Sequence, residues 1–170
     1  IRWLQARPNI DPDRIAVTGN SRGGELSLLL GATFPAVKAV IAYVPSGLLW
    51  AGIGTPDDNG KGAWTHHGKT LPHVPQAEGL RVKPPDTPSS LEDPIPLAPI
   101  FLASLAATPD TTAMTIPVEK INGAVLLLSG EDDQMWTSTP FSELVIERLR
   151  ERQFPHPFQH LHYPDAGHLI

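Results

Sequence analysis

The sequence predicts an α/β fold in which helices flank a parallel sheet. Four predicted strands, three of them apolar runs, are spread along the chain, and helical patterns lie between them. Parallel strands need long crossover connections of this kind, and such crossovers are right-handed. The chain has 170 residues, 41% of them hydrophobic and 18% charged. We therefore expect a single globular domain over residues 1–170.

The first third of the chain contains two predicted strands with a helix between them. A short opening helix over 1–6 precedes the first strand, Ile15–Thr18. Leucines at helical spacing over 22–34 predict a helix that ends before Pro35. Residues 37–44 are almost continuously apolar, so we expect a strand that is buried on both faces.

Residues 47–116 differ from the rest of the chain. They are rich in Pro, Gly and Asp and show little periodicity, apart from one helical piece near 98–107. A loop of this length is usually functional or mobile. We therefore predict a long Pro-rich, lid-like insertion within the domain.

Regular structure resumes with a third buried strand over 124–128. Thr139 and Pro140 are suited to the cap and first position of the next helix. Its predicted apolar stripe contains Phe141, Leu144, Val145 and Leu149. A fourth strand is expected over 158–163.

One motif joins the first predicted strand to the helix that follows it. Gly19-Asn20-Ser21-Arg22-Gly23 has the form G-x-S-x-G. Alone, this pattern also arises by chance in Gly-rich loops, but between a strand and a helix it is typical of a sharp turn that exposes a serine hydroxyl. Ser21 is the candidate nucleophile, and Gly19 and Gly23 provide the small flanks that a tight turn needs. The backbone N–H of Arg22, at the start of the helix, is the candidate oxyanion donor.

Two later segments can complete a catalytic triad with Ser21. Asp133 and His168 each follow a different predicted strand. Ligands bind at the carboxyl ends of parallel strands, so these side chains are expected to meet at one edge of the sheet. His168 is the candidate general base, and Asp133 would orient it. Asp132 is the alternative acid, although the G-x-x-D spacing from Gly130 favours Asp133. The order Ser, Asp, His is that of α/β-hydrolases.

Other polar and aromatic residues have competing interpretations. Glu25 lies in the first helical turn, where the helix dipole favours a carboxylate, and is interpreted as structural. Trp136, Trp50 and Trp64 are candidates for the apolar wall of a substrate pocket, with core packing or lid packing as an equal alternative. His160 and His162 share one face of a predicted strand and could bind a metal, but the sequence offers no third ligand at suitable spacing.

Composition excludes several classes of site. The chain has no cysteine, which excludes disulfides, thiolate nucleophiles and Cys-ligated zinc. The net charge is −5 without a basic cluster, so nucleic acid is not expected as a partner. No run reaches the ~18 apolar residues of a membrane span. We expect a cytoplasmic protein, and the predicted chemistry needs no metal or organic cofactor.

Five stretches of the chain resemble one known family. IAVTGNSRGGEL at 15–26 resembles the nucleophile turn of the acyl-CoA thioesterase and bile acid-CoA:amino acid N-acyltransferase family. The other similar stretches follow in the family's order: GKTLP at 68–72, IPVEKI at 116–121, SGEDDQMW at 129–136 and YPDAGHLI at 163–170. Together they span nearly the whole chain and correspond to the family's C-terminal catalytic domain.

The resemblance implies a partial α/β-hydrolase fold and a covalent acyl-enzyme, with Ser21, Asp133 and His168 in the triad positions. Family members that conjugate bile acids use cysteine as nucleophile, so the serine here favours hydrolysis over transfer to an amino acid. The family's N-terminal β-sandwich and the first strands of its hydrolase sheet have no counterpart in this sequence. We therefore expect an N-terminally truncated domain or a homo-oligomer that covers the exposed edge of the first strand.

These observations predict a serine acyl hydrolase that cleaves acyl-CoA thioesters to free acid and CoA. The same triad would also suit a carboxylesterase or a dienelactone-hydrolase-like esterase. A third interpretation is an incomplete or inactive hydrolase domain that serves as a binding module. In each case the expected ligand is a small acyl-CoA or ester molecule.

Overall fold

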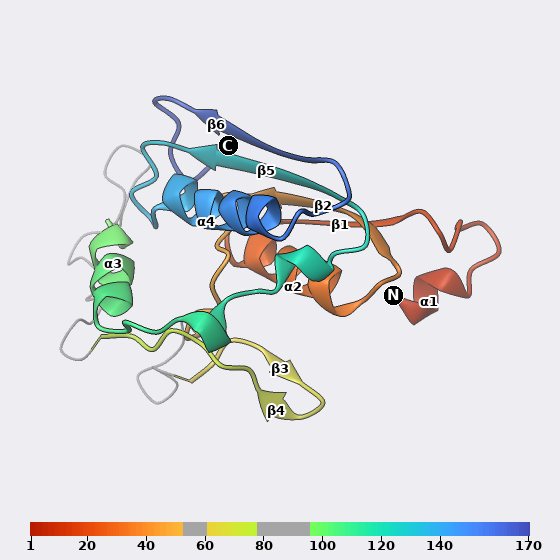
Figure 1. The fold of residues 1–170 in the computed structure, drawn as a ribbon, viewed down its shortest axis with the longest axis horizontal. Coiled ribbons are helices and arrows are strands. Elements are labelled where there is room, and N and C mark those ends of the chain that lie inside the picture. The colour runs from red at the N-terminus through yellow and green to blue at the C-terminus, as the bar shows by residue number, and fades with distance from the viewer. Residues whose placement is uncertain (53–60, 78–95) are drawn as a thin grey trace, which may run out of the picture.

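The computed structural model describes residues 1–52, 61–77 and 96–170 and contains a four-stranded sheet (Figure 1). The strands are β1 (Ile15–Asn20), β2 (Val37–Tyr43), β5 (Ala124–Gly130) and β6 (Phe158–Tyr163). They lie in the order β1-β2-β5-β6, and each neighbouring pair is parallel. The predicted α/β class with a parallel sheet is therefore confirmed. All four carboxyl ends meet at one edge of the sheet.

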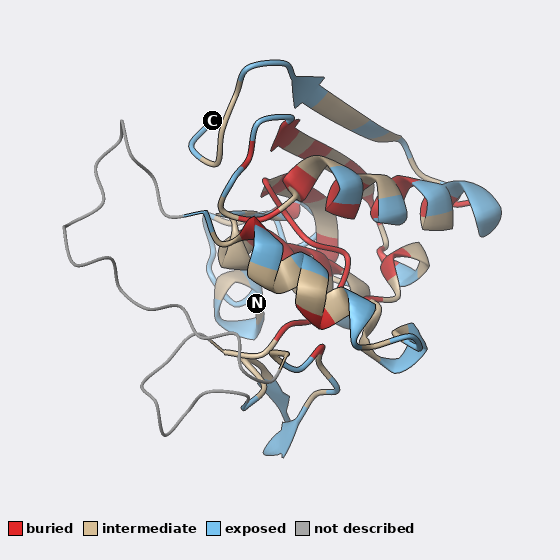
Figure 2. Cartoon of the chain, turned by 90° about the vertical axis from the view of Figure 1, so that its left-hand side faces the viewer, coloured by how far each residue is buried: buried red, intermediate tan, exposed pale blue. Residues whose placement is uncertain are grey.

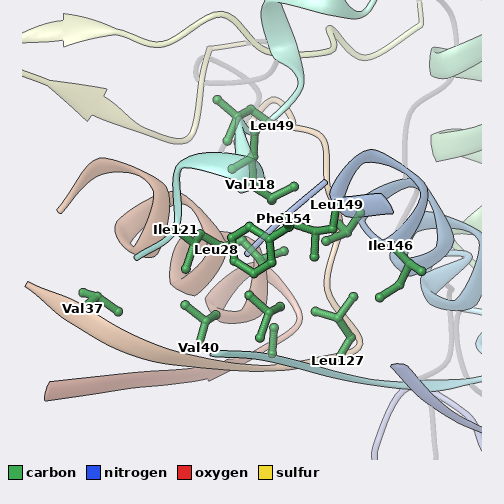
Figure 3. Packing of buried hydrophobic residues seen from close by; sticks show 14 residues of the cluster. Leu28, Val37, Val40, Leu49, Val118, Ile121, Leu127, Ile146, Leu149 and Phe154 are labelled. Carbon is green, nitrogen blue, oxygen red and sulfur yellow. The ribbon is translucent and has the colours of Figure 1, made fainter. Parts of the chain in front are cut away.

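Two helices pack against the same face of this sheet (Figure 1). They are α2 (Arg22–Thr33), which follows β1, and α4 (Ser138–Glu151), which follows β5. Figure 3 shows side chains from both helices and from the sheet meeting in one apolar layer, with Leu28, Val40 and Leu149 among them. Figure 2 shows the buried residues on the inner sides of the helices and the exposed residues on their outer sides.

Smaller elements connect this framework. Helix α1 (Arg2–Gln5) precedes β1, and β3 (Thr65–His66) pairs with β4 (Lys69–Thr70) in a two-stranded antiparallel hairpin. The predicted helix near 98–107 is confirmed as α3 (Ala98–Ala106). Two 3₁₀ turns, η1 (Thr112–Met114) and η2 (Val118–Lys120), lead into β5.

The predicted insertion over 47–116 is described in part, because 53–60 and 78–95 lie outside the described residues. Its described parts contribute to the core. Leu48, Trp50 and Val74 are buried and form a second apolar cluster with Trp136 and Phe141. The start of the insertion is therefore anchored in the protein, and its role as a lid remains a prediction.

Three sequence expectations about local structure were wrong. In β2, Val40 and Ala42 are buried but Ile41 is only half-buried, because α2 and α4 cover one face of the sheet. Helix α4 begins at Ser138 rather than at Pro140, and Leu144 on its predicted apolar stripe is 43% exposed.

Strand β1 lies at one edge of the four-stranded sheet. Along it, Ala16, Thr18 and Asn20 are exposed, in alternation with less exposed residues. Coverage of this edge by a neighbouring chain remains a prediction. No helix in the described ranges is both long and apolar enough to cross a membrane.

Candidate active site

Ser21 occupies a strained turn between the end of β1 and the start of α2. Its backbone has φ 56° and ψ −120°, in a region that residues other than glycine rarely adopt. The Ser21 N–H donates to the carbonyl of Tyr43 in β2 at 2.9 Å. The Ser21 carbonyl accepts from the N–H of Glu25 at 3.0 Å. The turn is thus held at both ends by backbone hydrogen bonds.

Of the three glycines around Ser21, only two occupy positions that have no room for a side chain. A Cβ atom on Gly19 would collide with the carbonyl of Gly23, so the turn cannot close with a larger residue there. A Cβ atom on Gly24 would lie 2.8 Å from the carbonyl oxygen of Tyr43. A Cβ atom on Gly23 would meet nothing within 4 Å. The space requirement therefore falls on Gly19 and Gly24, and Gly23 of the motif is not needed for packing.

The structure brings Ser21, His168 and Asp133 together from three separate strand ends. His168 Nε2 lies 2.8 Å from Ser21 Oγ. On its other side, His168 Nδ1 lies 2.9 Å from one carboxylate oxygen of Asp133 and 3.0 Å from the other. Ser21 follows β1, Asp133 follows β5 and His168 follows β6. The distances fit a hydrogen-bonded chain from hydroxyl through imidazole to carboxylate.

The carboxylate of Asp133 is fixed by its own loop. Its side chain is 1% exposed and accepts hydrogen bonds from the backbone N–H groups of Met135 and Trp136, at 3.0 and 3.2 Å. Asp132, the alternative acid, is exposed and accepts from the side-chain amide of Gln134 at 2.8 Å. The structure thus places Asp133 rather than Asp132 on the histidine.

Backbone hydrogen bonds join the loop that carries Asp133 to the loop that carries His168. The N–H of Glu131 donates to the carbonyl of Tyr163 at 3.1 Å. The N–H of Asp132 donates to the carbonyl of Ala166 at 3.0 Å. A Cβ atom on Gly130 would collide with the Ala166 carbonyl, so close contact of the loops requires glycine there. The separation of the acid and the base is therefore set by main-chain contacts.

Sequence reasoning missed the environment of Glu25. This side chain is fully buried and forms an ion pair with Arg22, with 2.6 Å between Glu25 Oε2 and Arg22 Nη1. Burial raises the pKa of Glu25 to about 7, although Arg22 and the hydrogen bonds from Trp64 and Trp50 oppose the shift. The sequence signal was the Arg and Glu at i, i+3 directly after the nucleophile, but spacing alone did not reveal the burial.

Trp50 and Trp136 are core residues in the structure rather than an open pocket wall. They are 2% and 1% exposed. The indole N–H of Trp50 donates to Ser46 Oγ at 2.8 Å, and that of Trp136 donates to the Val44 carbonyl at 2.9 Å. The Trp136 ring also meets the His168 ring edge-on, with centroids 6.1 Å apart. Trp136 therefore packs beside the candidate base, where it limits the positions of the imidazole.

His160 and His162 lie side by side on β6, with ring centroids 5.5 Å apart. Each bonds a different carboxylate: His160 Nδ1 lies 2.8 Å from Glu143 Oε1, and His162 Nδ1 bonds Glu131. Within the described part of the chain, no group of three or more potential ligands could hold a metal ion. The two histidines thus belong to separate histidine–carboxylate pairs.

Comparisons with known proteins identify the family and the fold. The whole chain, residues 1–170, matches the family described as BAAT / Acyl-CoA thioester hydrolase C terminal. It is 28% identical over 170 residues to human acyl-coenzyme A thioesterase 1, covering all of this chain and 36% of that protein. It is equally similar, at 28%, to human mitochondrial acyl-coenzyme A thioesterase 2, covering all of this chain and 31% of that protein. The chain thus spans about a third of the length of these curated relatives.

Solved structures support the fold assignment. The acylaminoacyl peptidase of Pyrococcus horikoshii matches 99% of this chain and 22% of its own chain, with a TM-score of 0.58 and 14% sequence identity. That peptidase has the α/β-hydrolase fold, and the likeness concerns the fold alone. The chain has this fold and belongs to the BAAT / acyl-CoA thioester hydrolase C-terminal family.

Proposed function

We propose that this protein is a serine hydrolase that cleaves acyl-CoA thioesters through a covalent acyl-enzyme. The observation that carries the proposal is the position of His168. Its Nε2 lies 2.8 Å from Ser21 Oγ, and its Nδ1 lies 2.9 Å from the Asp133 carboxylate. Nucleophile, base and orienting acid are recognised by this geometry rather than by their positions in the sequence.

The first half of the proposed reaction forms the acyl-enzyme. Ser21 Oγ attacks the thioester carbonyl while His168 Nε2 accepts the hydroxyl proton. The Asp133 carboxylate holds the Nδ1–H and stabilises the imidazolium. The resulting tetrahedral oxyanion would accept a hydrogen bond from the N–H of Arg22, which has no acceptor within α2 because Arg22 is the first residue of that helix. The C–S bond then breaks, and CoA leaves as a thiol after taking the proton from His168.

The second half releases the acid. Water enters, His168 Nε2 accepts one of its protons, and the oxygen attacks the ester carbonyl of the acyl-enzyme. The bond to Ser21 Oγ breaks, and His168 returns the proton to that oxygen. The free acid leaves and the site is restored, so the atoms and protons balance over one turnover.

The proposed substrate class rests on the family and on the nucleophile. The names of the two human relatives describe them as acyl-coenzyme A thioesterases. The serine nucleophile, in a chain without cysteine, favours transfer of the acyl group to water. A lid-like role for 47–116 and a cytoplasmic location belong to the same proposal, and one relative is named as mitochondrial.

The proposal is tested with a fluorophosphonate probe and a substrate panel. We expect the wild-type protein to be labelled, and Ser21→Ala to abolish labelling. Hydrolysis of acyl-CoA by Ser21→Ala should fall by at least about 10³-fold, because the covalent route is lost. The panel compares acyl-CoA thioesters of increasing chain length with p-nitrophenyl esters.

Other results would favour the alternatives. Much faster cleavage of the simple esters would identify a carboxylesterase with the same triad. A wild-type protein that is never labelled, or labelling that survives Ser21→Ala, would contradict the triad and leave the binding-module interpretation.

A further inference from the structure

The proposed reaction leaves one buried acid beside the nucleophile without a role. Glu25 lies one helical turn after Ser21, and its backbone N–H donates to the Ser21 carbonyl at 3.0 Å. Its side chain is fully buried. An ionised carboxylate is costly to bury unless it is paired and hydrogen-bonded, so the contacts of Glu25 must explain why it is there.

The Glu25 carboxylate accepts hydrogen bonds from three separate segments of the chain. Arg22 Nη1 donates from the first turn of α2 at 2.6 Å. The indole N–H of Trp64, which precedes β3, donates at 2.6 Å. The backbone N–H of Trp50, in the segment after β2, is a further donor. One carboxylate therefore links the nucleophile helix to two parts of the insertion.

Arg22 extends the same link. Its second guanidinium nitrogen, Nη2, donates to the carbonyls of Trp50 and Ala51, at 3.2 and 3.0 Å. A planar guanidinium that is held on several acceptors has little freedom to rotate. Arg22 is also the residue whose backbone N–H is the proposed oxyanion donor. Fixing its side chain on Glu25, Trp50 and Ala51 therefore restrains the main chain at the catalytic turn.

Burial of the ion pair between Glu25 and Arg22 costs free energy of folding. Burial lowers the pKa of Arg22 and raises that of Glu25, so both charged forms are disfavoured by loss of water. Among the described residues, Arg22 is the charged group that lowers the pKa of Glu25 and so opposes the effect of burial. Replacing a buried ion pair by apolar residues is often neutral or stabilising, so such a pair is weak support for a purely structural role.

We propose that Glu25 is a positioning residue for the acyl transfer at Ser21. Through Arg22, Trp50 and Trp64 it holds the first turn of α2 against the insertion, so that the Arg22 amide stays aimed at the oxyanion. This inference rests on the proposed function. Oxyanion stabilisation depends on donors fixed within a few tenths of an ångström, so loosening this turn slows the chemistry more than it weakens binding.

The test is the steady-state kinetics of Glu25→Gln and Glu25→Ala. We expect kcat to fall by about 10- to 100-fold in Glu25→Ala and by less in Glu25→Gln, which keeps one acceptor for the indole and amide donors. KM should change little in both variants. The second-order rate of fluorophosphonate labelling should fall in parallel with kcat, while labelling still goes to completion.

Glu119→Gln provides the matched control. Glu119 forms a partly buried ion pair with Arg148, with 2.6 Å between the charged atoms, between η2 and α4. Its loss should lower thermal stability without changing kcat. If the Glu25 variants fail to fold, Trp64→Phe removes one donor from the carboxylate and leaves the Arg22 ion pair, and it should still lower kcat severalfold.

The outcomes separate this inference from the proposed function. Wild-type kcat and labelling rate in Glu25→Gln, Glu25→Ala or, where those do not fold, Trp64→Phe would overturn the positioning role and leave the triad intact. A wild-type protein that is not labelled would overturn the proposed function and this inference with it. A fall in kcat at unchanged KM that is smaller in Glu25→Gln than in Glu25→Ala would support the inference.

Discussion

Two chains of hydrogen bonds in the described part of the molecule link a serine, a histidine and a carboxylate. One runs from Ser21 through His168 to Asp133. The other runs from Ser129 through His160, with 2.7 Å between Ser129 Oγ and Nε2, to Glu143 at 2.8 Å from Nδ1. The residue types and distances are nearly the same. The two chains differ in where the backbone puts them.

The two hydrogen-bond chains differ in which end is exposed, the serine or the carboxylate. Ser129 lies within β5 and is fully buried, whereas Glu143 at the far end is 45% exposed. In the first chain the acid is buried at 1% exposure, and the serine is half-buried in a strained turn at the strand ends. A substrate carbonyl can reach a hydroxyl at a strand end but not one inside a sheet. Placement by the fold, rather than the residue set, distinguishes a candidate site from a structural contact.

The largest expected effect comes from replacing His168 by glutamine, with the same change at His160 as the comparison. His168→Gln should lower kcat/KM by about 10³-fold or more, because Ser21 loses its base. His160→Gln should keep wild-type kinetics and lose about 1–3 kcal/mol of unfolding free energy, because the Ser129 hydroxyl stays buried with fewer partners. Kinetic assays and denaturant titrations measure the two effects. Loss of activity in folded His160→Gln would erase the distinction between the chains.

The unfolding free energy as a function of pH tests the burial of Glu25, the acid beside the Ser21–His168–Asp133 chain of hydrogen bonds. The pKa of Glu25 is about 7 in the folded protein, above its ordinary value of 4.5. The folded state therefore binds the proton more tightly, and the unfolding free energy should fall as pH rises from about 4.5 to about 7. The fall is at most roughly 3 kcal/mol, at 1.36 kcal/mol per pKa unit.

Glu25→Gln checks the source of this pH dependence. Urea titrations of wild type and variant at pH 5, 6, 7 and 8 would compare the two slopes. The variant should lose the part of the slope that lies below pH 7. Identical slopes would show that Glu25 is not the group responsible.

Two glycines test the strained turn that distinguishes Ser21 from Ser129. Gly19→Ala should cost about 1–3 kcal/mol and slow probe labelling, because its Cβ would strike the Gly23 carbonyl. Gly23→Ala meets open space and replaces glycine within a helix, so it should be neutral or stabilising by up to about 1 kcal/mol. Thermal unfolding and labelling rates give both numbers. Equal damage from both substitutions would mean that the turn is not limited by the Gly19 contact.

Glu143→Gln should have the smallest effect. The carboxylate is 45% exposed, so its bond to His160 is screened by water and is expected to contribute less than about 1 kcal/mol. Labelling by the probe should not change. A large loss of stability in thermal denaturation would show that the second chain depends on its acid as strongly as the first is proposed to depend on Asp133.

The sequence was sufficient for the elements whose signals are local. Apolar runs located β1, β2 and β5, and the leucine spacing located α2. Strand β6 also lies over the residues predicted for it, 158–163. The meeting of three strand-end residues could be predicted, because parallel strands share a carboxyl edge. These residues are Ser21, Asp133 and His168. The approach of the side chains then followed from the order of the strands.

Other features depend on contacts between distant segments and could not be read from local patterns. Thr139 does not cap α4, because its hydroxyl bonds the carbonyl of Gly130 at 3.1 Å and the helix already begins at Ser138. Glu25 was placed in the first helical turn from its position alone, and its contacts with Trp50 and Trp64 of the insertion could not be predicted from that position. Trp50 and Trp136 are apolar in either interpretation, and their burial depends on how the insertion packs.

The backbone bonds between the loops of Asp133 and His168 have a consequence for how the nucleophile can vary. Glu131 and Asp132 donate to carbonyls in the histidine loop, and none of these bonds involves residue 21. The backbone contacts that position the imidazole and its carboxylate therefore do not depend on the side chain at position 21. A single codon change at position 21, to a thiol or to an inert methyl group, would alter the reaction while leaving the proton acceptor in place.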